Sequence, residues 1–257
     1  MDCKRTEIAA ATPEKPIRAV LCGRHLDDLR NLLRDFPIVE VDQQPDVVIA
    51  HGGDGSLLGA ERDWPGIPKC PLRDRRMNPK CPAHPDERVL NLLVRGELKE
   101  SRVGKLVARM ADGRQLVALN DLSMSKGIVT SSVRYRLWLD DELYKGQIVG
   151  DGLVVATPFG STGYFRNITQ SLFRVGIGLA FNNCSDQVNH VIVDRRTVIR
   201  TKVLRGPAVL VADNDPVRLD LDEGDEVTIV QGEQETVILG LDIFRCRECY
   251  SLRENGV

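Results

Sequence analysis

Residues 51–58 of the chain read His-Gly-Gly-Asp-Gly-Ser-Leu-Leu, and they follow the apolar run Val-Val-Ile-Ala that ends the segment 46–50. The apolar run predicts a buried strand. Ser56 predicts the N-cap of a helix that begins with Leu57 and Leu58. The order strand, three-glycine turn, helix brings backbone N–H groups and the positive end of a helix close to any bound anion.

One carboxylate, that of Asp54, lies in the middle of this turn. A carboxylate among amides is a poor phosphate ligand, but it can act as a base toward a hydroxyl group or meet phosphate through a bridging cation. The turn lacks both the Gly-Lys-Ser/Thr end of a Walker loop and the G-x-G-x-x-G of a Rossmann fold. A tight turn with a solvated Asp54 is the alternative interpretation.

The composition is that of an ordinary globular protein. The chain has 257 residues, 42% hydrophobic and 28% charged, with a formal net charge of −2. This length allows one large domain or two small ones, and the charge argues against a general nucleic-acid or membrane-surface binder. Because no apolar run reaches transmembrane length and residues 1–16 are polar, we expect a cytoplasmic protein with no membrane or nucleic-acid partner.

The 7 cysteines are spread along the chain, and their odd number argues against a secreted disulfide framework. Cys70, Cys81 and His84 lie in one Pro-rich stretch, and Cys246 and Cys249 form a single CxxC motif. Zinc prefers four nitrogen or sulfur donors, so the two groups together are potential ligands. Nothing in the sequence brings them together, and we expect reduced thiols and no protein-bound metal.

The first hundred residues alternate strands with helices. Strands are predicted at 17–22, 38–41 and 46–50, and helices at 26–36, after the glycine turn and at 86–98. Such alternation predicts a small doubly wound sheet whose ligands bind at the carboxyl ends of the strands. Residues 64–85 predict a long loop that either contacts polyphosphate or is simply solvated. Its basic residues include Arg73, Arg75, Arg76 and Lys80.

After about residue 100 the pattern changes to short strands. They are predicted at 105–110, 114–120, 133–139, 143–149, 152–156, 175–181, 190–193, 208–212, 227–230 and 237–241, with a potential helix after Thr162. The predicted fold is a doubly wound α/β domain followed by a β-sandwich-like domain, with the active site in the cleft between them. The expected bounds are 1–16 for a poorly ordered tail, 17–100 for the α/β domain, 101–241 for the β-rich domain and 242–257 for a segment that returns toward the α/β domain.

Residues 150–164, Gly-Asp-Gly-Leu-Val-Val-Ala-Thr-Pro-Phe-Gly-Ser-Thr-Gly-Tyr, carry the most information in the chain. A buried strand is followed by a glycine-flanked turn that can present Ser161, Thr162 and backbone groups to a base edge. Tyr164 can stack on that base. Asp151 can bind a ribose diol or an amide. The alternative is a turn whose Ser and Thr side chains cap the next helix.

Asn120 and Asp121 follow a predicted hairpin strand. The side chain of Asn120 has the paired donor and acceptor that suit adenine. Asp121 can accept hydrogen bonds from ribose hydroxyl groups. A β-bulge or turn is the alternative interpretation of this pair.

In this order and at these separations, the three stretches resemble the NAD kinase family. The family signature is a Gly-Gly-Asp-Gly turn, an Asn-Glu pair on a strand, and an Asp-Gly-(apolar)-Thr-Pro-x-Gly-Ser-Thr-Ala-Tyr run, found here at 52–55, 120–121 and 151–164. Residues 209–215 partly match a later strand that ends in Ser-x-Asp-Gly-Gln. The resemblance covers roughly residues 18–241 and implies an N-terminal α/β domain plus a central β-sandwich.

The resemblance implies transfer of the γ-phosphoryl group of ATP, or of another donor, to the adenosine-ribose 2′-hydroxyl of NAD, which gives NADP. Asp54 would accept the hydroxyl proton, and a divalent cation such as Mg²⁺ would accompany the donor. No lysine lies beside the turn, so the cation and backbone amides would supply more of the positive charge. The residues implied in binding phosphates or dinucleotide are Gly52, Gly53, Gly55, Asn120, Asp121, Asp151, Thr157, Ser161, Thr162, Gly163, Tyr164 and Asn167.

Several positions depart from the family pattern. Asp121 stands where the family has Glu, Asn167 where it often has Ser, and Asp215 where it has Gln; residues 68–73 replace its Asn-x-Gly-x-x-Gly-Phe-Leu segment. Two alternatives follow, namely a catalytically impaired NAD-binding regulatory protein and a kinase of the same superfamily for another hydroxyl substrate. The resemblance implies a homodimer or homotetramer. It leaves open whether the phosphoryl donor is ATP or polyphosphate and whether the acceptor is NAD or NADH.

Overall fold

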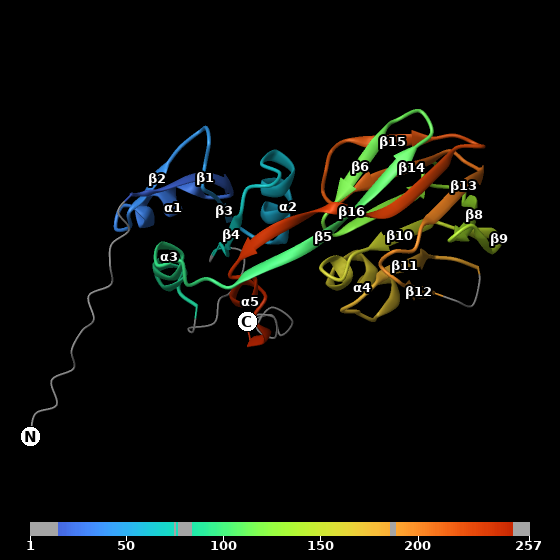
Figure 1. Cartoon of the computed structure of the whole chain (residues 1–257). Helices are drawn as coiled ribbons and strands as arrows, with labels where there is room; N and C mark the ends of the chain where they lie inside the picture. Colours follow the sequence, from blue (N-terminus) through green and yellow to red (C-terminus); the bar gives the residue numbers. More distant parts are fainter. Residues whose placement is uncertain (1–14, 75, 77–83, 186–188, 249–257) are drawn as a thin grey trace, which may run out of the picture. The chain divides into compact units, whose positions relative to one another are not determined.

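A computed structural model of the chain describes residues 15–74, 76, 84–185 and 189–248 (Figure 1). These residues form two compact units. The first contains the described residues up to Arg102 and from Val237 onward, and the second contains Val103–Thr236. Most of the predicted tail 1–16 lies outside the described residues, as do the predicted loop and motif residues Arg75, Lys80, Cys81 and Cys249.

The first unit is built on a parallel sheet. Its strands lie in the order β2-β1-β3-β4, and the end of β16 pairs in parallel with β4 through Ile238 and Lys69. The elements of this unit are β1 (Ile17–Gly23), α1 (Leu26–Leu33), β2 (Ile38–Glu40), β3 (Val47–His51), α2 (Asp54–Asp63), β4 (Lys69–Leu72), α3 (Asp86–Val94), the end of β16 (Glu226–Leu239) and α5 (Leu241–Phe244).

Helices cover both faces of this sheet. Ala19 of β1 and Ile49 of β3 point into a core that also contains Leu29 of α1 and Leu90 of α3. The alternate strand residues point to the opposite face because successive side chains on a strand alternate. Helix α2 packs there against β1, β3 and β4. The predicted doubly wound α/β arrangement is confirmed.

Helix α2 begins earlier than the sequence predicted. Asp54 is its first residue, and the extended Gly53 occupies the N-cap position without a side-chain cap, so the prediction that Ser56 is the N-cap is wrong. The carbonyl of Gly53 accepts the backbone N–H groups of Ser56 and Leu57 instead. Asp54 therefore lies in the first helical turn, where the helix dipole favours negative charge.

The predicted loop 64–85 contains a strand. Strand β4 pairs in parallel with β3 from Val48 opposite Lys69 to His51 opposite Leu72. Four residues that include a proline show no strand periodicity, so this pairing is decided by the neighbouring strand. The helix predicted at 86–98 stops at Val94, because Gly96 has φ 66° and ends it in the left-handed conformation.

The second unit consists of two antiparallel layers. One is a six-stranded sheet in the order β12-β11-β10-β7-β14-β15, and the other contains β5, β6, β8, β9, β13 and the start of β16. The elements are β5 (Glu100–Met110), β6 (Gln115–Ala118), β7 (Asp121–Lys126), β8 (Val133–Leu139), β9 (Glu142–Gly150), β10 (Gly152–Ala156), η1 (Gly160–Thr162), α4 (Tyr164–Thr169), β11 (Ile177–Asn182), β12 (His190–Val193), β13 (Ile199–Arg205), β14 (Ala208–Ala212) and β15 (Arg218–Leu221).

Inward-facing side chains of the two layers share one core, in which Tyr135 and Leu137 of β8 meet Leu153 of β10 and Leu179 of β11. The predicted β-sandwich-like fold is thereby confirmed. Strands β7, β13 and β15 were not predicted, although polar side chains occupy every second position of much of their length, a pattern typical of half-buried strands. The strands predicted at 227–230 and 237–241 are one strand, β16, whose exposed polar residues 231–235 hid its continuity.

Candidate active site

The glycine turn lies where β3 ends and α2 begins, at the carboxyl edge of the parallel sheet. Gly52 has φ 146°, and a Cβ at this position would clash with the Ser56 hydroxyl. The backbone N–H of Gly52 donates to Leu72 O (2.7 Å) and so ties the turn to the end of β4. Only glycine allows this close approach of turn, helix and neighbouring strand.

Asp54 faces two guanidinium groups. Its Oδ1 lies 3.8 Å from Nη2 of Arg73 and 3.6 Å from Nη2 of Arg245. Within the described part of the chain this buried oxygen accepts no hydrogen bond, and the distances to the arginines are those of ion pairs without direct hydrogen bonds. A carboxylate oxygen with an available lone pair thus lies beside two positive charges.

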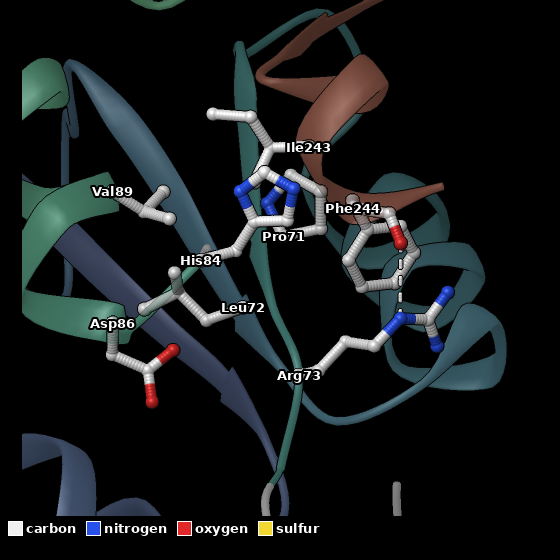
Figure 2. A pocket seen from close by; sticks show the side chains of 8 residues that line it. All are labelled: Pro71, Leu72, Arg73, His84, Asp86, Val89, Ile243 and Phe244. Atoms are coloured by element: carbon white, nitrogen blue, oxygen red, sulfur yellow. Dashed lines mark hydrogen bonds between the residues drawn. The ribbon is translucent and has the colours of Figure 1, made fainter. Parts of the chain in front are cut away.

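Arg73 is fixed by the C-terminal segment of the same unit. Its Nε donates to the carbonyl oxygen of Phe244 (3.0 Å), and its guanidinium lies 4.0 Å from the centre of the Phe244 ring. Figure 2 shows this hydrogen bond and the two side chains next to each other. The sequence predicted Arg73 only as one basic residue of a loop, and it gave no role to Arg245. The sequence argument considered only lysine as a cation beside the turn and did not consider these two arginines. The sequence position of Arg73 could have pointed to a role in the site, because Arg73 directly follows a strand that ends at the ligand-binding edge of the sheet.

A second charged group lies at the same edge. Nδ1 of His25, after β1, lies 2.6 Å from Oδ2 of Asp74, after β4, and the backbone N–H of Arg76 donates to the other Asp74 oxygen. Burial tends to raise the pKa of Asp74, but the hydrogen bonds from Arg76 and His25 and the charges of His25 and His51 outweigh it and hold the pKa below its usual value. Sequence reasoning missed this pair because its members are 49 positions apart.

In the second unit, Asp213 organises the segment that contains Asn120. Its carboxylate accepts the backbone N–H groups of Leu119 (2.8 Å), Asn120 (2.7 Å) and Asp121 (3.1 Å). Three donors on one carboxylate hold the segment between β6 and β7 in one conformation. In the sequence, Asp213 stands out only as part of the partial match at 209–215.

The 157–163 turn fixes the same segment from its other side. The hydroxyl of Thr157 donates to Leu119 O (2.7 Å), and Thr157 N–H donates to Asn120 O (2.8 Å). A Cβ on Gly160 would clash with Asn120 O, and Gly163 lies beside the Asn120 amide. The structure thus brings Asn120, Thr157 and Gly163 together, as their shared assignment to one ligand requires.

Asn120 and Asp121 both hold side-chain oxygens that the fold shields from solvent. The side-chain oxygen of Asn120 is buried and accepts no hydrogen bond from any described residue. Burial, reinforced by the charge of Asp213, raises the pKa of Asp121 to about 7. A buried polar atom without a partner is costly in a folded protein, so the Asn120 oxygen is suited to a ligand that donates a hydrogen bond to it.

Of the remaining predicted residues, some form hydrogen bonds within the fold and others are exposed. The Ser161 hydroxyl is buried and donates to Pro158 O and Phe173 O, so it is used within the fold. Helix α4 begins after Gly163 without a side-chain cap, which argues against the alternative that Ser161 and Thr162 cap it. Thr162 and Asn167 are exposed.

Asp151 and Tyr164 each meet an asparagine that follows or ends β11. The Asp151 carboxylate lies 2.6 Å from Lys126 Nζ and accepts a hydrogen bond from Asn183; the hydrogen bond from Lys126, followed by that from Asn183, lowers its pKa. The Tyr164 hydroxyl accepts a hydrogen bond from Asn182 (3.1 Å). Asp151 is therefore an ionised group already paired with a cation.

Among the described residues, no group of three or more His, Cys, Asp and Glu side chains is placed to hold a metal ion. Burial raises the pKa of Cys70 to about 12, which leaves it a protonated thiol. His84 instead lines a hollow of about 20 Å³ with Pro71 and Ile243, which has room for about one water molecule (Figure 2). No described helix has the length and apolar character needed to cross a membrane.

The chain resembles known proteins of one family. A family model, the ATP-NAD kinase C-terminal domain, matches residues 119–241. An NAD kinase of Thermomicrobium roseum is 29% identical over 205 residues, which cover 74% of this chain and 68% of that protein. These matches support the resemblance to the NAD kinase family. Alignments with further curated NAD kinases span about half of their length.

Two solved structures share the NAD kinase fold. The chain is similar to the crystal structure of yeast NADH kinase complexed with NADH, with a TM-score of 0.77, 15% identity, and coverage of 95% of this chain and 87% of that one. It is also similar to an NAD kinase from Archaeoglobus fulgidus in complex with ATP, with a TM-score of 0.69, 21% identity, and coverage of 90% and 97%. At these identities the likeness concerns the fold.

Proposed function

We propose that the chain is an NAD kinase that transfers the γ-phosphoryl group of ATP to the 2′-hydroxyl of the adenosine ribose of NAD, which gives NADP and ADP. The observation that carries the proposal is the Asp54 carboxylate. Its Oδ1 accepts no hydrogen bond within the described chain and lies in the first turn of a helix that follows a glycine turn. A base that must take a proton from a hydroxyl group needs such an available lone pair.

The proposed step balances as a phosphoryl transfer. The ribose 2′-oxygen forms a bond to the γ-phosphorus, and the bond from that phosphorus to the β–γ bridging oxygen breaks. ADP leaves with the bonding electron pair, and the hydroxyl proton passes to Asp54. Backbone N–H groups at Gly53 and Gly55 are proposed to contact phosphate oxygens at the start of α2, where the helix dipole is positive. Gly52, whose N–H donates to Leu72 O, is proposed to shape the turn that brings them there.

We assign dinucleotide binding to the second unit. The unpartnered Asn120 oxygen suits the exocyclic amino group of adenine, and Asp121 the ribose hydroxyl groups. Thr157 orients Asn120 through the segment 119–120. Thr162, Gly163 and Tyr164 are proposed to line the adenine pocket, with Ser161 supporting their turn. Asp151 and Asn167 are proposed on the nicotinamide side.

The divalent cation is proposed to enter with ATP. Described side chains do not form a metal cage, and two guanidinium groups face Asp54, so a cation held mainly by protein ligands does not fit there. Mg²⁺ is commonly bound by substrate phosphates and water with few protein ligands. From the family resemblance we further propose that the phosphoryl donor is ATP rather than polyphosphate. We also propose a cytoplasmic location and a homodimer or homotetramer.

An assay with purified protein, Mg-ATP and NAD tests the function, with NADP detected by an NADP-specific dehydrogenase. Product formation is expected, and Asp54→Asn is expected to lower kcat by about two to four decades, the usual scale for loss of a general base. NAD affinity measured by calorimetry is expected to stay within about threefold. Asp63→Asn, at the exposed far end of α2, is the matched control and is expected to keep full turnover.

Two outcomes would contradict the proposal. Tight NAD binding without NADP in the wild-type protein would indicate a non-catalytic binding protein. Full turnover of Asp54→Asn would reject the general-base role.

A further inference from the structure

Hydrogen bonds join the ends of strands β1, β3 and β4 into a closed ring. The backbone N–H of Arg24, after β1, donates to His51 O (3.0 Å), and Nδ1 of His51 lies 2.6 Å from Arg24 O. The backbone N–H of Asp74, after β4, donates to Gly52 O (3.4 Å). Nδ1 of His25 lies 2.6 Å from Oδ2 of Asp74 and closes the ring. The first glycine of the turn is therefore a member of this ring.

The contact between His25 and Asp74 crosses a whole strand. Strand β3 lies between β1 and β4 in the sheet, and it pairs with them as far as Gly23 opposite His51 and His51 opposite Leu72. A side chain that follows β1 can meet one that follows β4 only across the end of β3. Because the glycine turn leaves β3 at this point, the contact bridges the strand end that carries the turn.

The chemistry of the pair decides which atom carries the proton. The Asp74 side chain is 2% exposed, and its burial would raise the pKa, but the hydrogen bonds from the Arg76 N–H and from His25 outweigh burial and keep the pKa low. An ionised carboxylate only accepts hydrogen bonds, so Nδ1 of His25 carries a proton and donates it. Such a charge-assisted bond is stronger than a neutral one, and it fixes the orientation of the imidazole.

A shift of the ring would reach Asp54 through a single residue. Gly53 separates Gly52 from Asp54, the first residue of α2. Gly52 is held on two further sides, because its N–H donates to Leu72 O and a Cβ on it would clash with the Ser56 hydroxyl. Gly52 therefore cannot move without moving the start of α2. Misplacing a catalytic group by about 1 Å can cost about 10²-fold in rate.

We propose that His25 and Asp74 are positioning residues for the phosphoryl transfer: the hydrogen bond between them fixes the glycine turn and thereby places the carboxylate of Asp54. The proposal rests on the function proposed above and deepens it. Neither residue belongs to the three stretches that carry the family resemblance. The role uses only Nδ1 of His25, whose side chain is 37% exposed. A contact of Nε2 with a ligand is the alternative that the test separates.

Substitutions of His25 separate the two nitrogen atoms of its ring. His25→Asn keeps an amide donor close to the position of Nδ1, and Asn tolerates the left-handed backbone of this residue, which has φ 50°. His25→Gln moves the donor outward, toward the position of Nε2, and His25→Ala removes it. Asp28→Asn, which breaks an exposed ion pair with Arg76 three residues further along the chain, is the matched control.

The first readout is hydrogen exchange of the Gly52 and Asp74 amides, measured by NMR on the full chain without ligand or turnover. His25→Ala is expected to speed exchange at both amides by about 10–100-fold, the scale of a lost hydrogen bond to a charged group. His25→Asn and Asp28→Asn should stay within about threefold of the wild type. In an Asp74→Ala background, His25→Ala should leave Gly52 exchange unchanged, which separates the lost bond from backbone strain at residue 25.

The second readout is NADP formation. His25→Ala is expected to lower kcat by about tenfold or more, because the base is misplaced. KM for NAD should stay within about twofold, since NAD binding is assigned to the second unit. His25→Asn should recover most of the lost kcat, and His25→Gln should not. Asp28→Asn should keep full turnover.

The outcomes separate this proposal from the kinase function. If the wild-type protein forms no NADP, the kinase function fails, while faster Gly52 exchange in His25→Ala still supports the fixing of the turn. Unchanged Gly52 exchange or unchanged kcat in His25→Ala would overturn the positioning role. Recovery of kcat by His25→Gln rather than by His25→Asn would overturn it in favour of a ligand contact through Nε2. A lowered urea midpoint with wild-type kcat would assign the pair to stability alone.

Discussion

The carboxylate of Asp213 accepts the backbone N–H of Asn120 at 2.7 Å, although the two residues are 93 positions apart in the chain. It accepts the N–H groups of Leu119 and Asp121 as well. A short segment between two strands is thereby held by one side chain from the end of a third. This relationship explains why Asn120 can keep its side-chain oxygen available for a ligand.

Removing that carboxylate is expected to destabilise the second unit. Asp213→Ala leaves three backbone donors without their acceptor and should lower the free energy of unfolding by about 3 kcal/mol, since an unsatisfied buried donor costs about 1–3 kcal/mol. Urea unfolding followed by circular dichroism measures this change. Asp220→Ala, which removes an exposed carboxylate on β15, should change it by less than about 0.5 kcal/mol. Equal midpoints for the two variants would refute the role of Asp213.

Gly160→Ala is expected to displace Asn120. The added Cβ would come well within 3 Å of the Asn120 carbonyl oxygen, and backbone cannot yield as a flexible side chain does. NAD affinity should fall by about tenfold or more, because a base-recognising amide must be placed to within about 0.5 Å.

Gly146→Ala on β9 is the matched control for this substitution, since a Cβ there meets no atom within 4 Å. It should bind NAD as the wild type does. Calorimetric titration with NAD measures both variants, and unchanged affinity in Gly160→Ala would show that the turn does not position Asn120.

Asp121 is expected to make stability depend on pH. Burial and the charge of Asp213 raise its pKa to about 7, so between about pH 4 and pH 7 the folded chain binds a proton that the unfolded chain releases. The free energy of unfolding should therefore fall as the pH rises through this range. Asp121→Asn lacks the carboxyl and should be more stable than wild type at pH 8 by roughly 2–4 kcal/mol, since one pKa unit corresponds to about 1.4 kcal/mol.

The difference between Asp121→Asn and wild type should shrink toward zero near pH 4. Urea titrations at pH 4, 6 and 8 measure it, with Asp220→Asn as the exposed control. A difference that stays constant over this range would show that Asp121 is ionised throughout.

Lys69 and Glu61 form an ion pair of 2.6 Å inside the first unit, where the Lys69 side chain is 0% exposed. Lys69 also donates to the carbonyl oxygens of Trp64 and Ile67. Lys69→Met should lower the free energy of unfolding by about 3–5 kcal/mol, because it leaves a buried carboxylate without its ammonium.

Adding Glu61→Met to that variant should restore much of the loss, since two apolar side chains can replace a buried pair. Denaturant unfolding measures both variants. Arg62→Gln, which breaks the exposed pair with Asp63, should cost less than about 1 kcal/mol. A Lys69→Met protein as stable as this control would mean that the buried pair contributes nothing.

Much of the fold followed from local patterns. The apolar run before the glycine turn, the alternation of strands and helices before residue 100 and the short strands after it predicted both architectures. Strand β4 was not predicted, because four residues that include a proline have no periodicity of their own. Strand β16 was predicted as two strands, because the middle of the strand is mostly exposed and polar. Helix ends depended on single residues, as at Gly96.

By itself, the sequence determined the candidate residues for the chemistry. A carboxylate in a glycine turn, an Asn-Asp pair and a Gly-Ser-Thr-Gly-Tyr turn are visible locally because spacing and residue type suffice to define them. Only the tertiary structure decided what surrounds them. Arg73 meets Phe244 across 171 positions, and Asp213 meets Asn120 across 93. Contacts of such separation depend on how strands pair and cores pack, and no local periodicity encodes them.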